Sequence, residues 1–594
     1  MSAPRLSEFI KAYDVRGVVP EQLNETVAFA IGEAFARVVA HPDGATSMVI
    51  GHDMRQSSPR LSRAFAAGVA AQGVDVILIG LCSTDGLYYA SGALDVPGAM
   101  FTASHNPARY NGIKLCRSGA RPVGQETGLT QIRDVAQSLL DSGEAEGAPT
   151  VDASAGSVRQ GSQSDFGAIN ERDVLAEYAQ FLRGLVDLRE IRPLTVVVDA
   201  GNGMGGHTVP AVLGSQGGLP ALPLTVIPLY FELDGTFPNH EADPLNPENL
   251  RDLQAAVIAH GADLGLAFDG DADRCFVVDE RGGPVSPSVI TALVGTREVA
   301  KERAAGRDAT IVYNVISSAA VPELIGEAGA TAIRTRVGHS FIKGEMARVQ
   351  AVFGGEHSAH YYFRDFWFAD TGMLAAMHVL AALGEQLRPL SELVAGFSRY
   401  VASGEINSTV ADASAATADV RAWAQEWARR AGQDVEFDEL DGMTVTHRQD
   451  PMWWFNLRAS NTEPLLRLNV EANDESTMAG VRDDVLSIVR GENVMFEAKP
   501  DVRGENLMAE ENLMSDEHQP KPASPTVPSV SPVPQIEPWL REILRCPKCR
   551  STLSDGSGPG GPELHCTNAE CRRAYRIDDG IPVLLVDESR SLQD

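Results

Sequence analysis

The most informative stretch of this sequence is Phe101-Thr102-Ala103-Ser104-His105-Asn106-Pro107. It follows an apolar run and ends in Asn-Pro, a dipeptide that signals a turn. A serine that carries or transfers a phosphoryl group needs an exposed turn, with donors nearby that absorb the charge. Lys114, just after the turn pair Asn111-Gly112, is one such donor. An ordinary loop serine beside a capping asparagine has the same local pattern, so three further motifs decide its meaning.

Short β-branched runs alternate with alanine-rich stretches of helical spacing. Strands are expected at residues 47–51, 74–80, 195–199, 263–268 and 310–313, and helices at 26–40, 371–383 and 413–431. This alternation predicts α/β domains with largely parallel sheets, in which ligands usually bind at the carboxyl ends of strands. Trp423 and Trp427 lie one helical turn apart and are expected in a core.

Length and charge limit the classes of function. A chain of 594 residues predicts about four or five domains. Its formal net charge of −30 disfavours direct binding of nucleic acid, because a phosphate backbone would repel it, but a locally basic pocket can still bind a small anion. The N-terminus lacks a secretory pattern and no apolar stretch is long enough to span a membrane, so a soluble cytoplasmic protein is expected.

The second motif is Asp269-Gly270-Asp271-Ala272-Asp273-Arg274. Its three carboxylates alternate in a strand-end loop and can converge on one hard cation, most simply Mg²⁺. A calcium-binding EF-hand is disfavoured because Arg274 stands where its sharp turn needs glycine, and because strand-like runs flank the loop. An aspartyl-phosphate enzyme with Asp269 as nucleophile is a second alternative that the sequence leaves open.

The third and fourth motifs present groups suited to a sugar and to a phosphate. The third is Gly354-Gly355-Glu356-His357-Ser358-Ala359-His360, preceded by Val337-Gly338-His339-Ser340-Phe341-Ile342-Lys343, and its acceptors and donors suit sugar hydroxyls. The fourth is Arg458-Ala459-Ser460-Asn461-Thr462-Glu463-Pro464, followed by Arg467, and can cradle a phosphate. The four motifs together predict phosphoryl transfer on a phosphosugar.

In this order the motifs resemble the α-D-phosphohexomutase family, most closely its bacterial phosphomannomutase/phosphoglucomutase branch. The resemblance covers roughly residues 8–490, begins with Tyr13-Asp14-Val15-Arg16-Gly17, and includes Gly51-His52-Asp53-Met54-Arg55. It implies four domains around a central cleft, each contributing one loop. The expected domains are 1–160 with the phosphoserine loop, 161–295 with the metal loop, 296–400 with the sugar loop and 401–490 with the phosphate loop.

The resemblance also implies roles for individual residues. Ser104 would be the phosphoserine, and Asp269, Asp271 and Asp273 would bind Mg²⁺ together with its phosphate. The transfer site would be lined by Tyr13, Arg16, Lys114 and Arg274, with Tyr13 contacting the substrate. His339 and His360 would lie near the substrate, and general acid or base help is expected from His360 or Lys114. The sugar would be held by Glu356 and Ser358, and the non-reacting phosphate by Arg458, Ser460, Asn461 and Thr462.

The implied reaction moves a phosphoryl group from Ser104 to a hexose monophosphate and back through a hexose 1,6-bisphosphate, which also acts as activator. Glu356 and Ser358 would contact the O3 and O4 hydroxyls of the sugar. Mannose and glucose differ only at C2, so this contact distinguishes them poorly and both are expected as substrates. The segment 361–367 resembles dedicated phosphomannomutases, which favours mannose. Ile316 stands where some members have a lysine, which puts one auxiliary contact in doubt. The alternatives are phosphoglucomutase as the main activity, or an inactive scaffold.

The C-terminus has a different character. Residues 491–536 are expected to form a Pro/Ser-rich disordered linker, followed by a small zinc-ribbon-like domain at 537–594. Cys546, Cys549, Cys566 and Cys571 favour a four-thiolate zinc site over disulfides in a reducing compartment. These cysteines, with the segment 579–585, resemble a zinc-ribbon family that activates methyltransferases, which implies a protein partner such as a methyltransferase.

Overall fold

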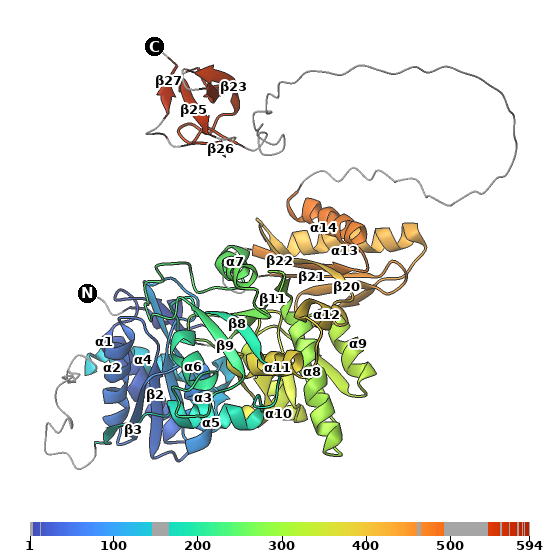
Figure 1. The fold of residues 1–594 in the computed structure, drawn as a ribbon. Coiled ribbons are helices and arrows are strands. Elements are labelled where there is room, and N and C mark those ends of the chain that lie inside the picture. The colour runs from blue at the N-terminus through green and yellow to red at the C-terminus, as the bar shows by residue number, and fades with distance from the viewer. Residues whose placement is uncertain are drawn as a thin grey trace, which may run out of the picture. The chain divides into compact units, whose positions relative to one another are not determined.

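The computed structural model describes residues 4–11, 14–144, 166–459 and 465–491, together with parts of the C-terminus at 544–558, 561–569, 571–578, 581–584, 586 and 589–592 (Figure 1). The chain forms two compact units, Met1–Glu497 and Ala498–Asp594. Except for Gly491, the expected linker lies outside the described residues.

The first sheet joins a parallel part to an antiparallel edge. Its strand order is β1-β5-β4-β2-β3-β7, in which β4, β2, β3 and β7 are parallel neighbours and β5 runs antiparallel to both β4 and β1. Its strands are β1 Val15–Val18, β2 Ser47–His52, β3 Asp75–Leu81, β4 Gly98–Phe101, β5 Tyr110–Arg117, β6 Arg121–Pro122 and β7 Ile169–Glu171. The helices of this region are α1 Glu25–Phe35, α2 Ser58–Ala70, α3 Thr84–Leu94 and α4 Leu129–Ser142.

Helices α1 and α2 pack at backbone contact, which two glycines permit. A Cβ atom on Gly32 would lie 2.2 Å from the carbonyl oxygen of Phe65, and one on Gly68 would lie 2.1 Å from that of Phe29. Together with α4, these helices bury one apolar core against the sheet.

The second and third sheets repeat the plan of the first. Their orders are β12-β11-β10-β8-β9 and β14-β13-β15-β16-β17. In each sheet three parallel neighbours form one side, β10, β8 and β9 or β14, β13 and β15, and the other two strands pair antiparallel. The strands of the second sheet are β8 Leu194–Asp199, β9 Leu224–Leu229, β10 Leu264–Phe268, β11 Cys275–Asp279 and β12 Pro284–Val285. Those of the third are β13 Thr310–Asn314, β14 Thr331–Thr335, β15 Phe353–Gly355, β16 Tyr361–Phe363 and β17 Ala369–Asp370.

The helices beside these two sheets share one large apolar core with α3, except α10, whose Ile342 and Met346 pack in a smaller separate cluster. They are α5 Leu175–Leu185, α6 Gly205–Val212, α7 Arg251–His260, α8 Pro287–Ala304, α9 Ala320–Glu327, α10 His339–Val349, α11 Gly372–Gly384 and α12 Leu390–Ala395. A buried carboxylate joins three of them: Asp85 of α3 accepts hydrogen bonds from Tyr178 of α5 and from Thr371, the N-cap of α11, both at 2.7 Å. The elements around the first three sheets are therefore tied together in their common interior.

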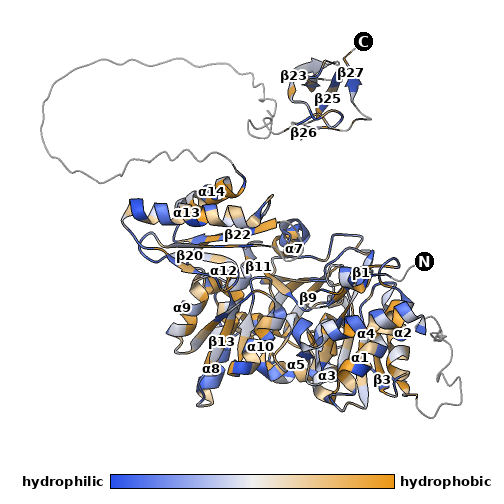
Figure 2. Ribbon diagram, turned by 180° about the vertical axis from the view of Figure 1, so that it is seen from behind, coloured by the Kyte–Doolittle hydropathy of each residue, from blue (hydrophilic) through white to orange (hydrophobic). Residues whose placement is uncertain are grey.

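The fourth sheet is antiparallel throughout, with the order β18-β22-β21-β20-β19. Its elements are β18 Val401–Thr409, α13 Ala413–Ala431, β19 Glu436–Asp438, β20 Met443–His447, β21 Trp453–Ala459, β22 Leu465–Ala472 and α14 Glu475–Val489. Helices α13 and α14 cover one face (Figure 1), and Figure 2 shows hydrophobic strands beside the largely polar α13. As expected, Trp423 and Trp427 lie in the core, with ring centroids 6.3 and 4.9 Å from that of Trp453.

The expectation of largely parallel sheets is therefore wrong for the fourth sheet and incomplete for the other three. The physical reason lies in the motifs, because each occupies the connection between two antiparallel neighbours: β4–β5, β10–β11, β15–β16 or β21–β22. A parallel crossover needs about a dozen residues or more, which these loops do not provide. The motifs nevertheless follow the carboxyl ends of their strands, as predicted.

The C-terminal unit is a small β structure. Its strands are β23 Leu553–Gly558, β24 Gly561–Cys566, β25 Arg573–Asp578, β26 Ile581–Pro582 and β27 Arg590–Ser591. Leu564 and Tyr575 form its buried centre together with Cys546 and Cys566, an arrangement consistent with the expected zinc-ribbon-like domain. Among the residues described in either unit, we find no helix with the length and apolar character needed to cross a membrane.

Candidate active site

Ser104 stands at the tip of the β4–β5 connection in a left-handed backbone conformation, with φ of 49°. That conformation is uncommon for residues other than glycine and persists only where the surroundings enforce it. The Ser104 N–H donates to Thr102 Oγ1 at 2.9 Å, and its Oγ donates to Asp269 Oδ2 at 2.8 Å. The serine of the first motif thus meets the first carboxylate of the second.

Arg55 fixes the serine loop through hydrogen bonds to its backbone, a role that no local pattern in the sequence marks. Arginine has five N–H donors, and here all five are used. One donates to Asp53 Oδ2 at 3.2 Å. The other four donate to the carbonyl oxygens of Ser104 at 2.8 Å, Asn106 at 2.6 Å, Pro107 at 3.0 Å and Tyr110 at 3.1 Å. Because its side chain is only 1% exposed, Arg55 fixes the loop without competing water.

The negative charge of the aspartate loop is paired with a lysine from the first sheet. Lys114 Nζ lies 2.6 Å from both Asp271 Oδ2 and Asp273 Oδ2, and Thr84 donates to Asp271 Oδ2 at 2.5 Å. Burial alone would lower the pKa of Lys114, but the two carboxylates outweigh it and raise this pKa well above its ordinary value. Burial likewise opposes ionisation of Asp271, yet Lys114 keeps the pKa of that carboxyl below its usual range. Lys114 is therefore a fixed positive charge and a hydrogen-bond donor, and its raised pKa disfavours the general acid or base role that was expected of it.

The triad formed by Asp269, Asp271 and Asp273 fits a hard cation. Each residue offers a carboxylate oxygen, and these oxygens lie within 4.8 Å of one another. Asp271 Oδ1 and Asp273 Oδ1 are buried and have no hydrogen-bond partner among the described residues. Burial raises the pKa of Asp269 to about 8, against the opposing charge of Arg274. Oxygen ligands of this kind are those that Mg²⁺ prefers.

Two further arginines contact the neighbours of the serine. Arg274 donates through Nε to Asp269 Oδ2 at 2.9 Å, and its Nη2 lies 2.8 Å from His105 Nδ1. Arg16 donates to Asn106 Oδ1 at 2.6 Å. Burial, followed by the charges of Arg274 and Arg16, lowers the pKa of His105 well below its ordinary value, so this imidazole is neutral beside the serine. Tyr13 lies outside the described residues.

The sugar motif is preorganised by hydrogen bonds to Glu356. Its Oε1 accepts from the N–H of Gly338 at 3.0 Å and from Asn314 at 3.2 Å, while its Oε2 accepts from the Tyr362 hydroxyl at 2.6 Å. The orienting roles of Asn314 and Tyr362 were not expected, because nothing in the local sequence marks them. Ile316 is buried, at 7% exposure.

His360 connects the sugar motif to the aspartate loop. Its Nδ1 lies 2.9 Å from Ser358 Oγ and its Nε2 lies 3.7 Å from Asp273 Oδ1. An isolated antiparallel bridge between Arg274 and His360 joins the two loops through their backbones. Residues of the first three motifs therefore meet at one place.

His339 differs from His360 in its surroundings. Burial, reinforced by the nearby charge of Lys343, lowers the pKa of His339 to about 3. Lys343 itself forms a buried ion pair with Asp370. His339 is consequently neutral over the ordinary pH range, and its expected place near the substrate suits a hydrogen-bonding role better than proton uptake.

The phosphate motif is described only in part. Arg458 is in place on β21, where its Nη2 donates to Glu405 Oε2 at 2.7 Å. Ser460, Asn461 and Thr462 lie outside the described residues, so their expected role stays a prediction. Glu405, the partner of the arginine, was not anticipated from the sequence.

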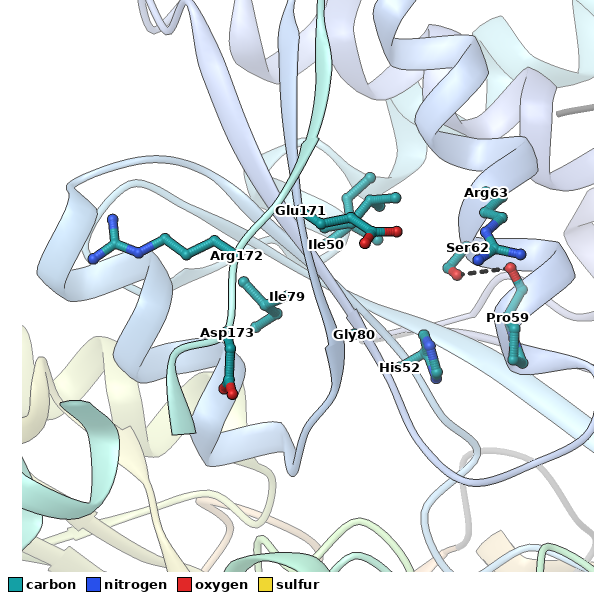
Figure 3. Close-up of a pocket in the computed structure, with 11 residues that line it drawn as sticks. Ile50, His52, Pro59, Ser62, Arg63, Ile79, Gly80, Glu171, Arg172 and Asp173 are labelled. Carbon is teal, nitrogen blue, oxygen red and sulfur yellow. Dashed lines mark hydrogen bonds between the residues drawn. The ribbon is translucent and has the colours of Figure 1, made fainter. Parts of the chain in front are cut away.

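A separate hollow of about 330 Å³ lies beside β2, β3 and α2 (Figure 3). His52, Ser62, Arg63 and Glu171 contribute to its lining, whereas none of the candidate site residues does. This hollow is therefore distinct from the place where the motif side chains meet.

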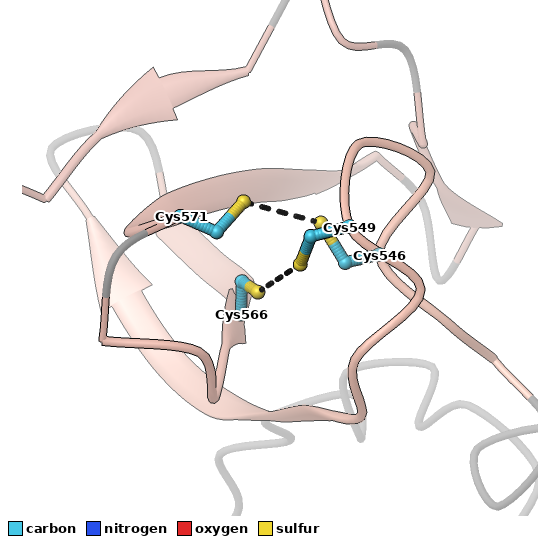
Figure 4. Close-up of side chains that lie close together, drawn as sticks. All are labelled: Cys546, Cys549, Cys566 and Cys571. Atoms are coloured by element: carbon cyan, nitrogen blue, oxygen red, sulfur yellow. Dashed lines mark hydrogen bonds between the residues drawn. The ribbon is translucent and has the colours of Figure 1, made fainter.

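In the C-terminal unit, four cysteine side chains converge (Figure 4). The Sγ atoms of Cys546, Cys549, Cys566 and Cys571 lie within 4.8 Å of one another, and none of the four forms a disulfide. A hydrogen bond from Ser551 lowers the pKa of Cys549 to about 6, whereas burial raises the pKa of Cys566 to about 12. This donor set has the composition of a structural zinc site.

Comparison with family models matches the larger unit in four consecutive segments. Residues 8–140, 176–283 and 287–400 match the models described as phosphoglucomutase/phosphomannomutase alpha/beta/alpha domains I, II and III. Residues 405–488 match the model of the phosphoglucomutase/phosphomannomutase C-terminal domain.

Individual relatives align over nearly their full length. A protein of Xanthomonas campestris described as "phosphohexose mutases" is 39% identical over 486 residues, which cover 81% of this chain and 99% of that protein. A phosphomannomutase of Salmonella typhimurium is 39% identical over 478 residues, covering 80% and 97%. The crystal structure of a phosphoglucomutase/phosphomannomutase family protein from Burkholderia thailandensis superposes with a TM-score of 0.68 at 28% identity, covering 82% and 99%.

Proposed function

The chain belongs to the phosphoglucomutase/phosphomannomutase family, and we propose that it is a phosphomannomutase that interconverts mannose 6-phosphate and mannose 1-phosphate. The enzyme class is that of an intramolecular phosphotransferase, an isomerase. The observation that carries the proposal is the meeting of Ser104 and Lys114, from the first sheet, with the aspartate triad, from the second. The relatives named phosphomannomutase support mannose as the sugar, and glucose phosphates remain compatible as substrates.

In the proposed reaction, Ser104 carries a phosphoryl group between turnovers. The bond between phosphorus and Ser104 Oγ breaks as a bond forms between phosphorus and the free hydroxyl of the hexose monophosphate. The resulting 1,6-bisphosphate turns around, and its other phosphate returns to Ser104. Phosphoryl transfer of this kind depends mainly on positioning and on neutralisation of charge.

The chain's own residues supply both requirements. Arg55 fixes the serine loop, and Lys114 and Arg274 place positive charge around Ser104. When the phosphoryl group returns, Asp269 can take the Ser104 hydroxyl proton through the 2.8 Å hydrogen bond between them. His360, beside Ser358 and Asp273, is the proposed group that exchanges a proton with the sugar hydroxyl.

Asp269, Asp271 and Asp273, together with the Ser104 phosphate, would hold Mg²⁺. The cation would neutralise negative charge on the transferring group. Glu356 and Ser358 would bind the sugar hydroxyls, while Arg458, with Ser460, Asn461 and Thr462, would bind the non-reacting phosphate.

Mass spectrometry of the peptide that contains Ser104 tests the carrier. We expect a phosphate on the serine that survives hydroxylamine, whereas an acyl phosphate on Asp269 would be cleaved. The substrate is tested by comparing kcat/KM for mannose 1-phosphate, glucose 1-phosphate and glucosamine 1-phosphate, with Mg²⁺ and a trace of hexose 1,6-bisphosphate. Failure to convert any of the three would contradict the proposed function and favour an inactive scaffold.

We further propose that the C-terminal unit binds one Zn²⁺ through Cys546, Cys549, Cys566 and Cys571. The convergence of four reduced thiols supports this site. Metal analysis of the full chain should find one zinc per molecule, and serine at Cys546 and Cys566 together should remove it. A metal content unchanged by those substitutions would contradict the site. Binding of a methyltransferase and a cytoplasmic location stay predictions, as do the domain boundaries.

A further inference from the structure

Two arginines of the fourth sheet face each other directly. Arg458 on β21 and Arg467 on β22 are cross-strand partners in the antiparallel register. Like charges placed directly opposite one another destabilise a sheet. The pair therefore needs an anion, and the proposed substrate phosphate is present during only part of the catalytic cycle.

Glu405 supplies an internal anion. It lies on β18 opposite Asn469, two residues along β22 from Arg467, so its side chain reaches both arginines diagonally. Its Oε2 accepts from Arg458 at 2.7 Å and its Oε1 lies 3.3 Å from Arg467. One carboxylate thus bridges two guanidinium groups, with a different oxygen on each.

An irregularity in β18 sets the direction of the Glu405 side chain. The register of β18 shifts between Ala402 and Glu405, and Gly404 has φ of 69°. Bulges re-aim side chains and are common beside active sites. A Cβ atom on Gly404 would meet nothing within 4 Å, so the left-handed conformation, rather than lack of space, favours glycine there.

The pairing leaves part of each guanidinium unused. The Nε atoms of Arg458 and Arg467 are buried and have no hydrogen-bond partner among the described residues. Glu405 also lies near the sugar motif: burial lowers the pKa of His357, and the charge of Glu405 opposes that shift. The bridged arginines therefore lie near the sugar motif.

We propose that Glu405 is a tethered competitor for the phosphate: its carboxylate occupies Arg458 and Arg467 when the anchor is empty and lowers the affinity of the anchor for phosphate. This inference rests on the proposed function, in which the 1,6-bisphosphate must leave the anchor, turn and bind again by its other end. An anchor that binds both states tightly lowers KM without raising kcat. By competing for the same donors, Glu405 limits this uniform binding and permits release.

The test compares the full-length wild-type chain with E405Q. Glutamine keeps the size and one acceptor oxygen but removes the charge. We expect the dissociation constant for inorganic phosphate, measured by calorimetry, to fall about tenfold in E405Q, which equals about 1.4 kcal/mol. KM for the hexose phosphate should fall with it, and kcat should fall as well because the bisphosphate leaves the anchor more slowly.

E436Q is the matched control, because Glu436 pairs with the exposed Arg448 at 2.9 Å in the same sheet; phosphate binding, KM and kcat should not change. An unchanged or weaker affinity for phosphate in E405Q would overturn the competition, and tighter phosphate with unchanged kcat would overturn the role in release. If E405Q does not fold, E405D decides, because its shorter side chain withdraws the charge and should tighten phosphate binding by a smaller factor. Absence of mutase activity in the wild type would refute the proposed function, whereas the phosphate measurement would still test Glu405.

Discussion

Replacing Arg55 by lysine should separate the placement of the serine loop from its chemistry. Lysine keeps the positive charge beside Asp53 but has three donors where arginine has five. At least two of the five acceptors, the Asp53 carboxylate and the carbonyls of Ser104, Asn106, Pro107 and Tyr110, would lose their donor. Hydrogen bonds to charged groups contribute about 1.5–3 kcal/mol each, so we expect a loss of about 3 kcal/mol or more in the free energy of unfolding.

The effect on turnover should be larger than this loss of stability explains. Ser104 has a left-handed backbone, and the Arg55 bond to its carbonyl oxygen at 2.8 Å helps to hold it there. Displacement of a reacting group by about 1 Å can cost roughly 100-fold in rate. We therefore expect kcat of R55K to fall about 100-fold under conditions where the protein remains folded.

Steady-state kinetics with hexose 1,6-bisphosphate, the phosphate content of Ser104 by intact mass, and thermal unfolding measure the three quantities. R183K is a matched control, because Arg183 donates to the backbone carbonyls of Val212, Pro220 and Gly214 beside the second sheet. It should lose stability while keeping kcat. Wild-type kcat in R55K, or an equal loss of kcat in R183K, would refute the reasoning.

Three other changes have expected outcomes. S104A should abolish both turnover and the covalent phosphate, measured by a mutase assay and by mass spectrometry; substantial turnover would assign the carrier to another group. Removal of divalent metal with EDTA should abolish turnover and Mg²⁺ should restore it, because Asp271 and Asp273 keep buried oxygens without a partner among the described residues; full activity without metal would contradict the proposed site. Burial raises the pKa of Asp85 from 3.8 to about 6, so its contribution to stability is present below pH 4 and is lost as pH rises through 6. The free-energy difference between D85N and wild type, measured by denaturant unfolding from pH 4 to 7, should therefore shift by about 2 kcal/mol in favour of D85N, and a difference independent of pH would count against this assignment.

Local patterns in the sequence were sufficient to predict several of the elements and the chemistry of the loops. Helix α13 begins and ends as expected, at Ala413–Ala431, because its N-cap aspartate, its helical periodicity and the glycine at its end are all local signals. The carboxylates of the aspartate motif could also be recognised from the sequence, because their alternate spacing in one loop already restricts the ion they can bind.

Only the tertiary structure decided which distant groups meet. Asp85 lies 286 positions from Thr371, and Glu405 lies 53 positions from Arg458, yet each pair is joined by a hydrogen bond. The antiparallel course of the fourth sheet likewise follows from strand pairing rather than from the pattern within any strand. Such contacts depend on how sheets and helices pack, and no short window of sequence contains both partners. The sequence alone therefore determined which chemical groups each loop carries, whereas packing determined which distant residues, the buried Arg55 and the half-buried Glu405 among them, contact those groups.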